Sequence, residues 1–254
     1  MNLAARDLSY GYRARTIGRD VTIALNGGET LALLGPNGGG KTTLLKTMLG
    51  LLPPQAGSIM LDQRPLASIS VAERARLIAY VPQSHAGTFA FTAFEIVLMG
   101  RTAHMGLLGA PSVKDRAVAR AMLERLGIAH LATQPYTMIS GGERQLVLVA
   151  RALAQEPRFI ILDEPTASLD FGNQGKVMRQ IRTLTGEGLG VLFTSHDPNQ
   201  VLRYADRVAL LGEGRILTVG RTRDVLTGSA LAGLYKAGVE VLTAADGRVA
   251  FLPG

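Results

Sequence analysis

The pattern of hydrophobic positions along the chain predicts an alternation of buried strands and helices. Residues 159–162 (Phe-Ile-Ile-Leu) and 191–194 (Val-Leu-Phe-Thr) form short runs without alternating polar positions. Such runs are typical of strands in a parallel sheet that is covered on both faces. Residues 30–34 form a similar run before a glycine-rich turn. Helical periodicity is found in three segments, residues 114–126, 145–154 and 172–186. The order predicts an α/β fold.

The middle of the chain differs from its two ends. Between residues 85 and 154, helical periodicity is interrupted by glycine and proline, whereas strand and helix alternate on either side. We therefore predict one domain over residues 1–254. Its expected parts are a core with an N-terminal β subdomain (1–84 and 155–235), an α-helical subdomain (85–154) and a C-terminal β-hairpin (236–254). The step Asp246-Gly247 between two apolar runs predicts the turn of that hairpin.

Composition allows a sizeable core and narrows the class of protein. Hydrophobic residues make up 47% of the 254 residues and charged residues 19%, so a folded chain is expected. No apolar run approaches the roughly 18–20 residues that span a bilayer, and the N-terminus lacks the pattern of a signal sequence. The absence of cysteine excludes disulfides and suits a reducing cytosol. The net charge of +7 is compatible with nucleic-acid binding. The basic residues are scattered in pairs, however, which favours an ordinary surface and no nucleic-acid partner.

A glycine-rich loop fits the pattern G-x-x-x-x-G-K-[ST] of phosphate-binding loops. It lies between the predicted strand 30–34 and a predicted helix that Gly50 ends, which is the context that the motif requires. Lys41 would reach the terminal phosphates of a nucleotide such as ATP, and the Thr42 hydroxyl would coordinate Mg²⁺. The alternative is a glycine-rich turn before an ordinary helix. The loop consists of Gly35, Pro36, Asn37, Gly38, Gly39, Gly40, Lys41, Thr42 and Thr43.

Polar residues follow two of the predicted buried strands. Asp163 and Glu164 come directly after residues 159–162, at the sheet edge where ligands bind in open parallel sheets. Asp163 would hold Mg²⁺, and Glu164 would orient and deprotonate a water that attacks the γ-phosphate. The alternative is a pair of solvated acids. His196 ends the predicted strand over residues 191–196 and is a third candidate at this edge; the alternative is a structural histidine.

A second glycine pair precedes the helix at 145–154. Ser140 would cap this helix, and Glu143 three residues later would complete a capping box. Capping does not explain why Gly141 and Gly142 leave the helix N-terminus without side chains, which favours a second anion site. One nucleotide does not need two such sites in one chain, so this site would serve a nucleotide held by another copy.

Taken in order, these motifs resemble those of the ATP-binding subunits of ABC transporters. The resemblance covers nearly the whole chain and implies a P-loop NTPase (RecA-like) core with an antiparallel β edge and an inserted α-helical subdomain. The motifs are residues 35–43, Val81-Pro82-Gln83, Ser140-Gly141-Gly142-Glu143, Ile160-Ile161-Leu162-Asp163-Glu164-Pro165, Ser168-Leu169-Asp170 and Ser195-His196.

The resemblance implies roles for further residues. Gln83 would contact Mg²⁺ and the attacking water, and His196 would contact the γ-phosphate. Asp170 would lie across the interface of a homodimer. Ser140, Gly141 and Gly142 would bind the γ-phosphate held by the partner copy.

An aromatic residue stacks on adenine in the family. Tyr12, 23 residues before Gly35, fits this role best, and Tyr10 is its rival. The alternative for either is a tyrosine packed at a strand end.

The chain departs from the family pattern at two positions. Glu143 replaces the usual glutamine of the signature motif, and a carboxylate near phosphates would weaken binding slightly. Thr42 replaces the common serine and keeps the hydroxyl, so little effect is expected.

Within the family, three segments resemble importers of iron–siderophores, haem and cobalamin. They are Phe89-Ala90-Phe91-Thr92 with Ile96-Val97-Leu98-Met99-Gly100-Arg101 and His104, Phe193-Thr194-Ser195-His196-Asp197-Pro198-Asn199-Gln200, and Gly238-Val239-Glu240-Val241. The second segment is also similar to the molybdate/tungstate branch.

The sequence thus predicts an ATPase that dimerises around two ATP and drives separate transmembrane permease subunits. It would be peripheral at the cytoplasmic face of the inner (plasma) membrane, with a substrate-binding protein as an indirect partner. The alternatives are a molybdate/tungstate importer ATPase and an ABC ATPase associated with nucleic acid or the ribosome. The chain lacks the fused second ATP-binding domain or coiled-coil insertion usual in the latter class.

Overall fold

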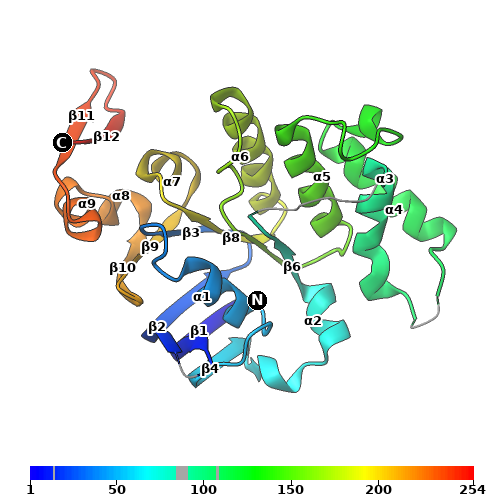
Figure 1. The fold of residues 1–254 in the computed structure, drawn as a ribbon, viewed down its shortest axis with the longest axis horizontal. Coiled ribbons are helices and arrows are strands. Elements are labelled where there is room, and N and C mark those ends of the chain that lie inside the picture. Colours follow the sequence, from blue (N-terminus) through cyan, green and yellow to red (C-terminus); the bar gives the residue numbers. More distant parts are fainter. Residues whose placement is uncertain (14, 84–90, 107–108) are drawn as a thin grey trace. The chain divides into compact units, whose positions relative to one another are not determined.

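The computed structural model describes residues 1–13, 15–83, 91–106 and 109–254, which form two compact units (Figure 1). Unit 1 comprises residues 1–67 and 192–254, and unit 2 comprises residues 68–191. Both ends of the chain therefore fold into unit 1. The subdomain boundaries expected from the sequence remain a prediction.

Unit 1 contains an antiparallel sheet with strand order β2-β1-β4-β5. Its strands are β1 (Asn2–Tyr12), β2 (Arg15–Asn26), β4 (Ala56–Leu61) and β5 (Arg64–Pro65). In β2, buried Val21, Ile23 and Leu25 alternate with more exposed residues, as expected for a sheet with one covered face. β1 was not expected from the sequence. Asp7 has a φ of 46° and the register shifts there, so a bulge interrupts the period of two.

A second group of strands in unit 1 has the order β10-β9-β3-β8. The strands are β3 (Thr30–Leu34), β8 (Gly190–Ser195, which begins in unit 2), β9 (Arg207–Gly212) and β10 (Arg215–Arg221). β3 pairs in parallel with β9, and β10 is antiparallel to β9. Every residue of β3 and β8 is buried, so the uniformly apolar runs do form strands covered on both faces. Helix α1 (Lys41–Met48) follows β3.

The remaining elements of unit 1 lie towards the C-terminus. They are α7 (Pro198–Tyr204), α8 (Thr222–Val225), α9 (Gly228–Tyr235), β11 (Val239–Thr243) and β12 (Val249–Pro253). β11 and β12 pair antiparallel, and Gly247 in their turn has a φ of 78°. The predicted hairpin is therefore confirmed.

Unit 2 combines two parallel strands with a group of helices. β6 (Ile78–Val81) pairs with β7 (Phe159–Leu162), and α3, α4 and α5 contact one another. The helices are α2 (Val71–Leu77), α3 (Ala93–Leu98), α4 (Val113–Arg125), α5 (Gly141–Leu153) and α6 (Phe171–Thr185). Short 3₁₀ turns are η1 (Leu66–Ser68, at the unit boundary), η2 (Met99–His104) and η3 (Ala129–Leu131). The three helices predicted from periodicity are confirmed.

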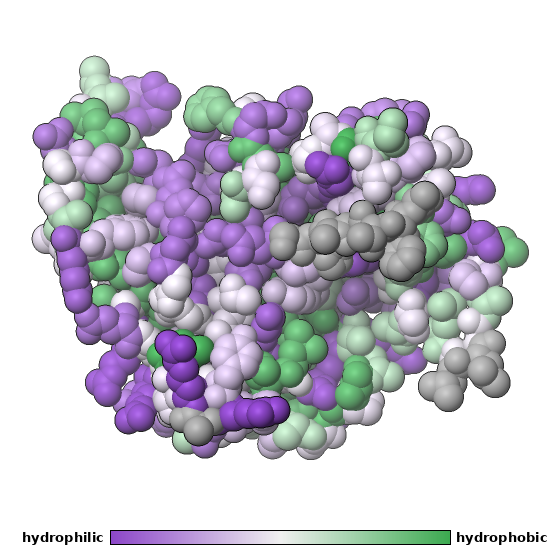
Figure 2. Space-filling model, viewed as in Figure 1, coloured by the Kyte–Doolittle hydropathy of each residue, from purple (hydrophilic) through white to green (hydrophobic). Residues whose placement is uncertain are grey.

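The helices are short, and the protein surface combines hydrophilic and hydrophobic residues. Among the helices of the described ranges, none combines the length and apolar character needed to cross a membrane. Figure 2 shows hydrophilic residues spread over the face in view, between smaller hydrophobic groups. Phe89 and Ala90, part of a segment that resembles metal-chelate importers, lie outside the described residues.

Candidate functional site

The phosphate loop in unit 1 depends on glycine for its backbone conformation. Gly38 and Gly40 have φ values of 76° and 89°, in the left-handed region that other residues rarely adopt. A Cβ at Gly40 would lie 2.6 Å from Cγ2 of Ile17, so space also excludes a side chain there. Gly40 is the N-cap of α1, and within the described part of the chain no side chain caps this helix. The first turn of α1 therefore offers its backbone N–H groups to an anion.

The lysine of the loop is turned back onto the loop itself. Lys41 is buried, and its Nζ donates hydrogen bonds to the carbonyl oxygens of Gly35 (2.8 Å) and Pro36 (3.1 Å). Its charge thus adds to the positive end of the α1 dipole. Thr42 is half-buried in the first turn of α1. The arrangement suits a phosphate group.

The two rival tyrosines occupy different environments. Tyr10 is fully buried, and its hydroxyl has no hydrogen-bond partner among the described residues. Burial raises the pKa of Tyr10 to about 12. Tyr12, at the end of β1, is 45% exposed. Of the two, Tyr12 is the ring that a ligand in solution can reach.

The end of β8 lies beside the phosphate loop. The N–H of Gly35 donates to the carbonyl oxygen of Ser195 (3.3 Å), and the exposed His196 follows directly. Ser195 Oγ accepts from the N–H of Asp197 (3.0 Å) and donates to Oε1 of Gln200 (3.1 Å). Unit 1 therefore brings together the phosphate loop and residues 195–199, which we call the histidine segment. The two are more than 150 residues apart in the sequence.

Unit 2 places the two predicted acids at the end of β7. Asp163 is buried, with 1% of its surface exposed, and the Tyr80 hydroxyl lies 3.4 Å from its Oδ2. Gln83 Nε2 donates to Oε2 of Glu164 (3.1 Å). Glu164 has a φ of 44°, a strained conformation that in folded proteins is often found at functional sites. Gln83 and Glu164, which were expected to act on the same water, are in contact.

The predicted capping box at the start of α5 is confirmed. The N–H of Glu143 donates to Oγ of Ser140 (3.3 Å), and the N–H of Ser140 donates to Oε2 of Glu143 (2.8 Å). Hydrogen bonds to the carboxylate from the Ser140 side chain and from the Ser140 N–H lower the pKa of the Glu143 carboxyl. The carboxylate is therefore engaged with the helix N-terminus.

Asp170 and the signature glycines are linked by a residue that the sequence reasoning missed. Asp170 caps α6 by accepting from the N–H of Asn173 (2.8 Å), and Asn173 Nδ2 donates to Asp170 Oδ2 (2.8 Å). The backbone hydrogen bond from Asn173 lowers the pKa of Asp170. A Cβ at Gly142 would lie 2.8 Å from Cγ of Asn173, so the Asn173 side chain packs on the backbone of α5. The spacing Asp-x-x-Asn at a helix start could have indicated this residue.

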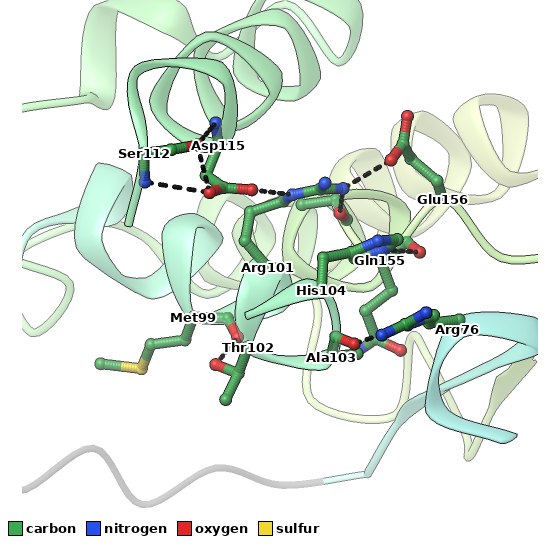
Figure 3. Close-up of polar contacts among 11 residues, drawn as sticks. Arg76, Met99, Arg101, Thr102, Ala103, His104, Ser112, Asp115, Gln155 and Glu156 are labelled. Atoms are coloured by element: carbon green, nitrogen blue, oxygen red, sulfur yellow. Dashed lines mark hydrogen bonds and ion pairs between the residues drawn. The ribbon is translucent and has the colours of Figure 1, made fainter. Parts of the chain in front are cut away.

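A buried arginine, Arg101, binds the C-terminal end of α5 (Figure 3), and this contact was not predicted from the sequence. The Arg101 side chain is 3% exposed. Its Nε donates to Oδ1 of Asp115 (2.9 Å), and its Nη1 donates to Oε2 of Glu156 (2.7 Å) and to the carbonyl oxygen of Ala154 (2.7 Å). An arginine directly after the apolar run 96–100 was the available signal, because buried charges need partners.

Two further contacts extend this cluster. His104 Nε2 lies 2.8 Å from the carbonyl oxygen of Gln155, and Arg76 Nε donates to the carbonyl oxygen of Ala103 (2.7 Å). Side chains of η2 thus satisfy carbonyl groups just beyond α5, which a helix leaves without internal partners. The cluster fixes η2, the start of α4 and the end of α5 to one another.

The residues expected to bind Mg²⁺ are of the right kind. Within the described ranges, no group of three or more histidine or acidic side chains could enclose a metal ion. Magnesium is usually bound by one or two carboxylates together with phosphate oxygens and water. Taken separately, the buried carboxylate of Asp163 in unit 2 and the hydroxyl of Thr42 in unit 1 are oxygen ligands of the kind that magnesium prefers.

Comparisons with known proteins identify the family of this chain. The family model described as ABC transporter matches residues 19–167. An ABC transporter ATP-binding protein of Haemophilus influenzae is 40% identical over 242 residues, covering 95% of this chain and 92% of its own length. The hemin import ATP-binding protein HmuV of Gloeobacter violaceus is 45% identical over 207 residues, covering 79% of this chain and 74% of its own length.

Solved structures show the same fold. A structure described as an inward-facing conformation of a metal-chelate type ABC transporter is 36% identical, with a TM-score of 0.88, and covers 99% of this chain and 96% of its own. CbiO1 from Clostridium perfringens, part of the ABC transporter complex cbiONQ, is 28% identical with a TM-score of 0.80, covering 91% of this chain and 92% of its own.

Proposed function

The chain belongs to the ABC transporter family as an ATP-hydrolysing ATP-binding protein, and from this premise we propose that it drives an importer. Two copies would close on two ATP molecules, and hydrolysis would reset the pair. The movement would be passed to separate permease subunits at the cytoplasmic face of the membrane. The observation that carries the proposal is the phosphate loop at the N-terminus of α1, where no side chain of the described residues caps the helix and Lys41 is buried against the loop.

The phosphates would bind along residues 35–43. Glycine conformations at 38 and 40 support this role, as does the position of Lys41. Thr42, Asp163 and Gln83 would hold Mg²⁺. When bound, that ion would neutralise charge that develops on the phosphate oxygens. Tyr12 would stack on adenine, supported by its exposed ring.

Glu164 would act as the general base. It would take a proton from a water molecule as the water oxygen attacks the γ-phosphorus and the bond to the β-phosphate oxygen breaks, which gives ADP and phosphate. The hydrogen bond from Gln83 (3.1 Å) supports this role because it fixes the direction of the carboxylate. His196 would contact the γ-phosphate. Its position supports this role, because the carbonyl oxygen of the preceding Ser195 accepts a hydrogen bond from the N–H of Gly35.

The start of α5 would complete the site of the second copy. Ser140, Gly141 and Gly142 would bind its γ-phosphate, and Asp170 would lie at the same interface. The helix N-terminus and the absence of side chains on the two glycines support this assignment.

The cargo would be a metal chelate. The relatives named hemin import proteins and the metal-chelate transporter structure support haem, an iron–siderophore or cobalamin. A molybdate or tungstate importer is the second candidate, supported by the sequence of residues 193–200. Copurification with the permease and substrate-binding protein, followed by ATPase assays with each compound, distinguishes the two. Strong, salt-dependent RNA binding would instead indicate the nucleic-acid class.

Substitution of the base tests the ATPase mechanism. We expect Glu164→Gln to lower ATP turnover at least about 100-fold and to accumulate an ATP-bound dimer, measured by steady-state hydrolysis and size-exclusion chromatography with ATP. Glu124→Gln, at an exposed position of α4, is the matched control and should hydrolyse ATP normally. Turnover of Glu164→Gln at the wild-type rate would show that another group is the base.

A further inference from the structure

The C-terminal helix and hairpin contact the histidine segment at two points in unit 1. The Tyr235 hydroxyl, at the end of α9, donates to the carbonyl oxygen of His196 (2.9 Å). Three residues beyond His196, the side-chain amide of Asn199 pairs with the backbone of Phe251 in β12. Asn199 Nδ2 donates to the Phe251 carbonyl (2.9 Å), and Asn199 Oδ1 accepts from the Phe251 N–H (2.8 Å).

The hydrogen bond from Tyr235 constrains the orientation of the His196 side chain. Fixing the carbonyl of His196 restricts the rotation of its peptide unit, and therefore the direction in which the imidazole leaves the backbone. Burial raises the pKa of Tyr235, with a smaller contribution from the charge of Asp197. The hydroxyl therefore stays protonated and remains a donor. Leu231 and Leu234 of the same helix are buried, so packing holds the helix that carries Tyr235.

Asn199 connects the same segment to the hairpin in the manner of a strand. Its amide offers one donor and one acceptor, and both are used by the main-chain groups of a single residue. The Phe251 side chain is 4% exposed, so the partner of this pair is fixed by packing. The chain from 196 to 199 is thus held at both ends by residues more than 35 positions away.

We propose that Tyr235 and Asn199 are positioning residues for His196, so that the C-terminal helix and hairpin set the geometry of the histidine at the γ-phosphate. This inference rests on the proposed function of His196. It gives the residues after 227 a part in ATP hydrolysis in addition to their part in the fold. Neither residue contacts the phosphate loop in the interactions described above, so ATP binding itself should not depend on them.

The first test removes only the tyrosine hydroxyl. We expect Tyr235→Phe to lower kcat roughly three- to tenfold, the size expected for one lost hydrogen bond, with KM for ATP within about twofold of wild type. Tyr204→Phe is the control, since no hydrogen bond of the Tyr204 hydroxyl is found in the described part of the chain. A wild-type kcat for Tyr235→Phe would overturn the proposal.

A double-mutant cycle separates positioning from general stability. If Tyr235 acts through His196, Tyr235→Phe should cause no further loss of kcat in a His196→Ala background. An equal loss in both backgrounds would show a purely structural role and overturn the inference. Wild-type turnover of His196→Ala would instead contradict the role of His196 in the proposed function, which keeps the two failures distinct.

Asn199 provides a graded second test. Asn199→Asp keeps an acceptor for the Phe251 N–H and loses the donor, whereas Asn199→Ala loses both. We expect kcat to fall in the order wild type, Asn199→Asp, Asn199→Ala, with each loss absent in the His196→Ala background. Losses that persist in that background would overturn the assignment of Asn199.

Discussion

Helix α1 begins directly after consecutive glycines and helix α5 begins with two glycines, but the two helix starts are stabilised in different ways. At the start of α1, Gly40 takes a left-handed conformation, and no capping side chain is found in the part of the chain that the structure describes. At the start of α5, Ser140 and Glu143 satisfy each other's backbone N–H groups. A helix start made of backbone alone leaves its donors to a ligand, whereas a capped start is already stable without one.

The other ends of the two helices repeat the contrast. After α1, Gly50 has a φ of 68°, and the N–H of Leu51 bonds back to the carbonyl of Lys46 (2.9 Å). After α5, the residue with positive φ is Glu156 (53°), whose carboxylate is paired with Arg101. Glycine adopts a positive φ without strain. In glutamate the same φ is strained, so favourable side-chain contacts must offset the strain. Thus α1 is built on glycine at both ends and α5 on side-chain contacts at both ends, and the two should fail differently when mutated.

The largest expected effect is at the start of α1. Gly40→Ala places a Cβ 2.6 Å from Ile17 in a backbone conformation with a φ of 89°. Both the clash and the strain oppose the phosphate-binding loop conformation. We expect ATP affinity to fall more than about 100-fold, which corresponds to about 2.7 kcal/mol, measured by titration with a fluorescent ATP analogue.

Gly38→Ala is the control that isolates strain from the clash. Gly38 has a φ of 76°, and an added Cβ would meet no atom of the described chain within 4 Å. We expect the free energy of ATP binding to become weaker by about 1–2 kcal/mol, because of the strained backbone conformation alone. If both variants bound ATP equally well, contact with Ile17 would have no role in shaping the loop.

A second large effect is expected at the end of α5, on the stability of the fold and not on ATP affinity. Arg101→Met leaves Asp115 and the carbonyl of Ala154 without their buried donor. Removing one partner of a buried ion pair costs about 3–5 kcal/mol, so we expect a clearly lower free energy of unfolding in urea. Arg125→Met is the control, because the pair of Arg125 with Glu187 is much more exposed and is worth at most about 1 kcal/mol. Equal losses in the two variants would contradict the importance of burial at Arg101.

These contrasts also mark what the sequence could predict. The strands β3, β7 and β8 follow from uniformly apolar runs, and the box at Ser140 follows from a spacing of three residues. Each is a local pattern, so one stretch of sequence contains all the information. No contact between Gln83 and Glu164 was predicted as such: the place of Glu164 after a buried strand gave it a role at the attacking water, and the resemblance gave Gln83 a role at the same water.

Several of the features that were missed depend on partners far apart in the chain. Arg101 meets a residue 55 positions away, and Asn199 meets one 52 positions away. Tyr235 bonds a backbone carbonyl, which carries no residue identity at all. Such contacts are set by tertiary packing, so the sequence around one residue does not identify its partner. β1 was missed for a local reason, since the bulge at Asp7 breaks the alternation that identifies a strand.

The smallest expected effect concerns Glu143, where the chain departs from the family pattern. A glutamine amide oxygen can accept the same hydrogen bond from Ser140, so Glu143→Gln should keep the box and change ATP turnover by less than about twofold. Glu143→Ala loses the acceptor and should cost about 0.3–1.5 kcal/mol of unfolding free energy.

The hydrogen bonds from Ser140 lower the pKa of Glu143 in the folded protein below its ordinary value of 4.5, so the ionised form stabilises the fold. That contribution is present above about pH 4.5 and is lost as the pH falls through the folded pKa. Urea unfolding from pH 3 to 8 should therefore show wild type slightly more stable than Glu143→Gln at neutral pH, with the difference vanishing in acid. A difference independent of pH would mean that the carboxylate charge does not contribute to the capping of α5.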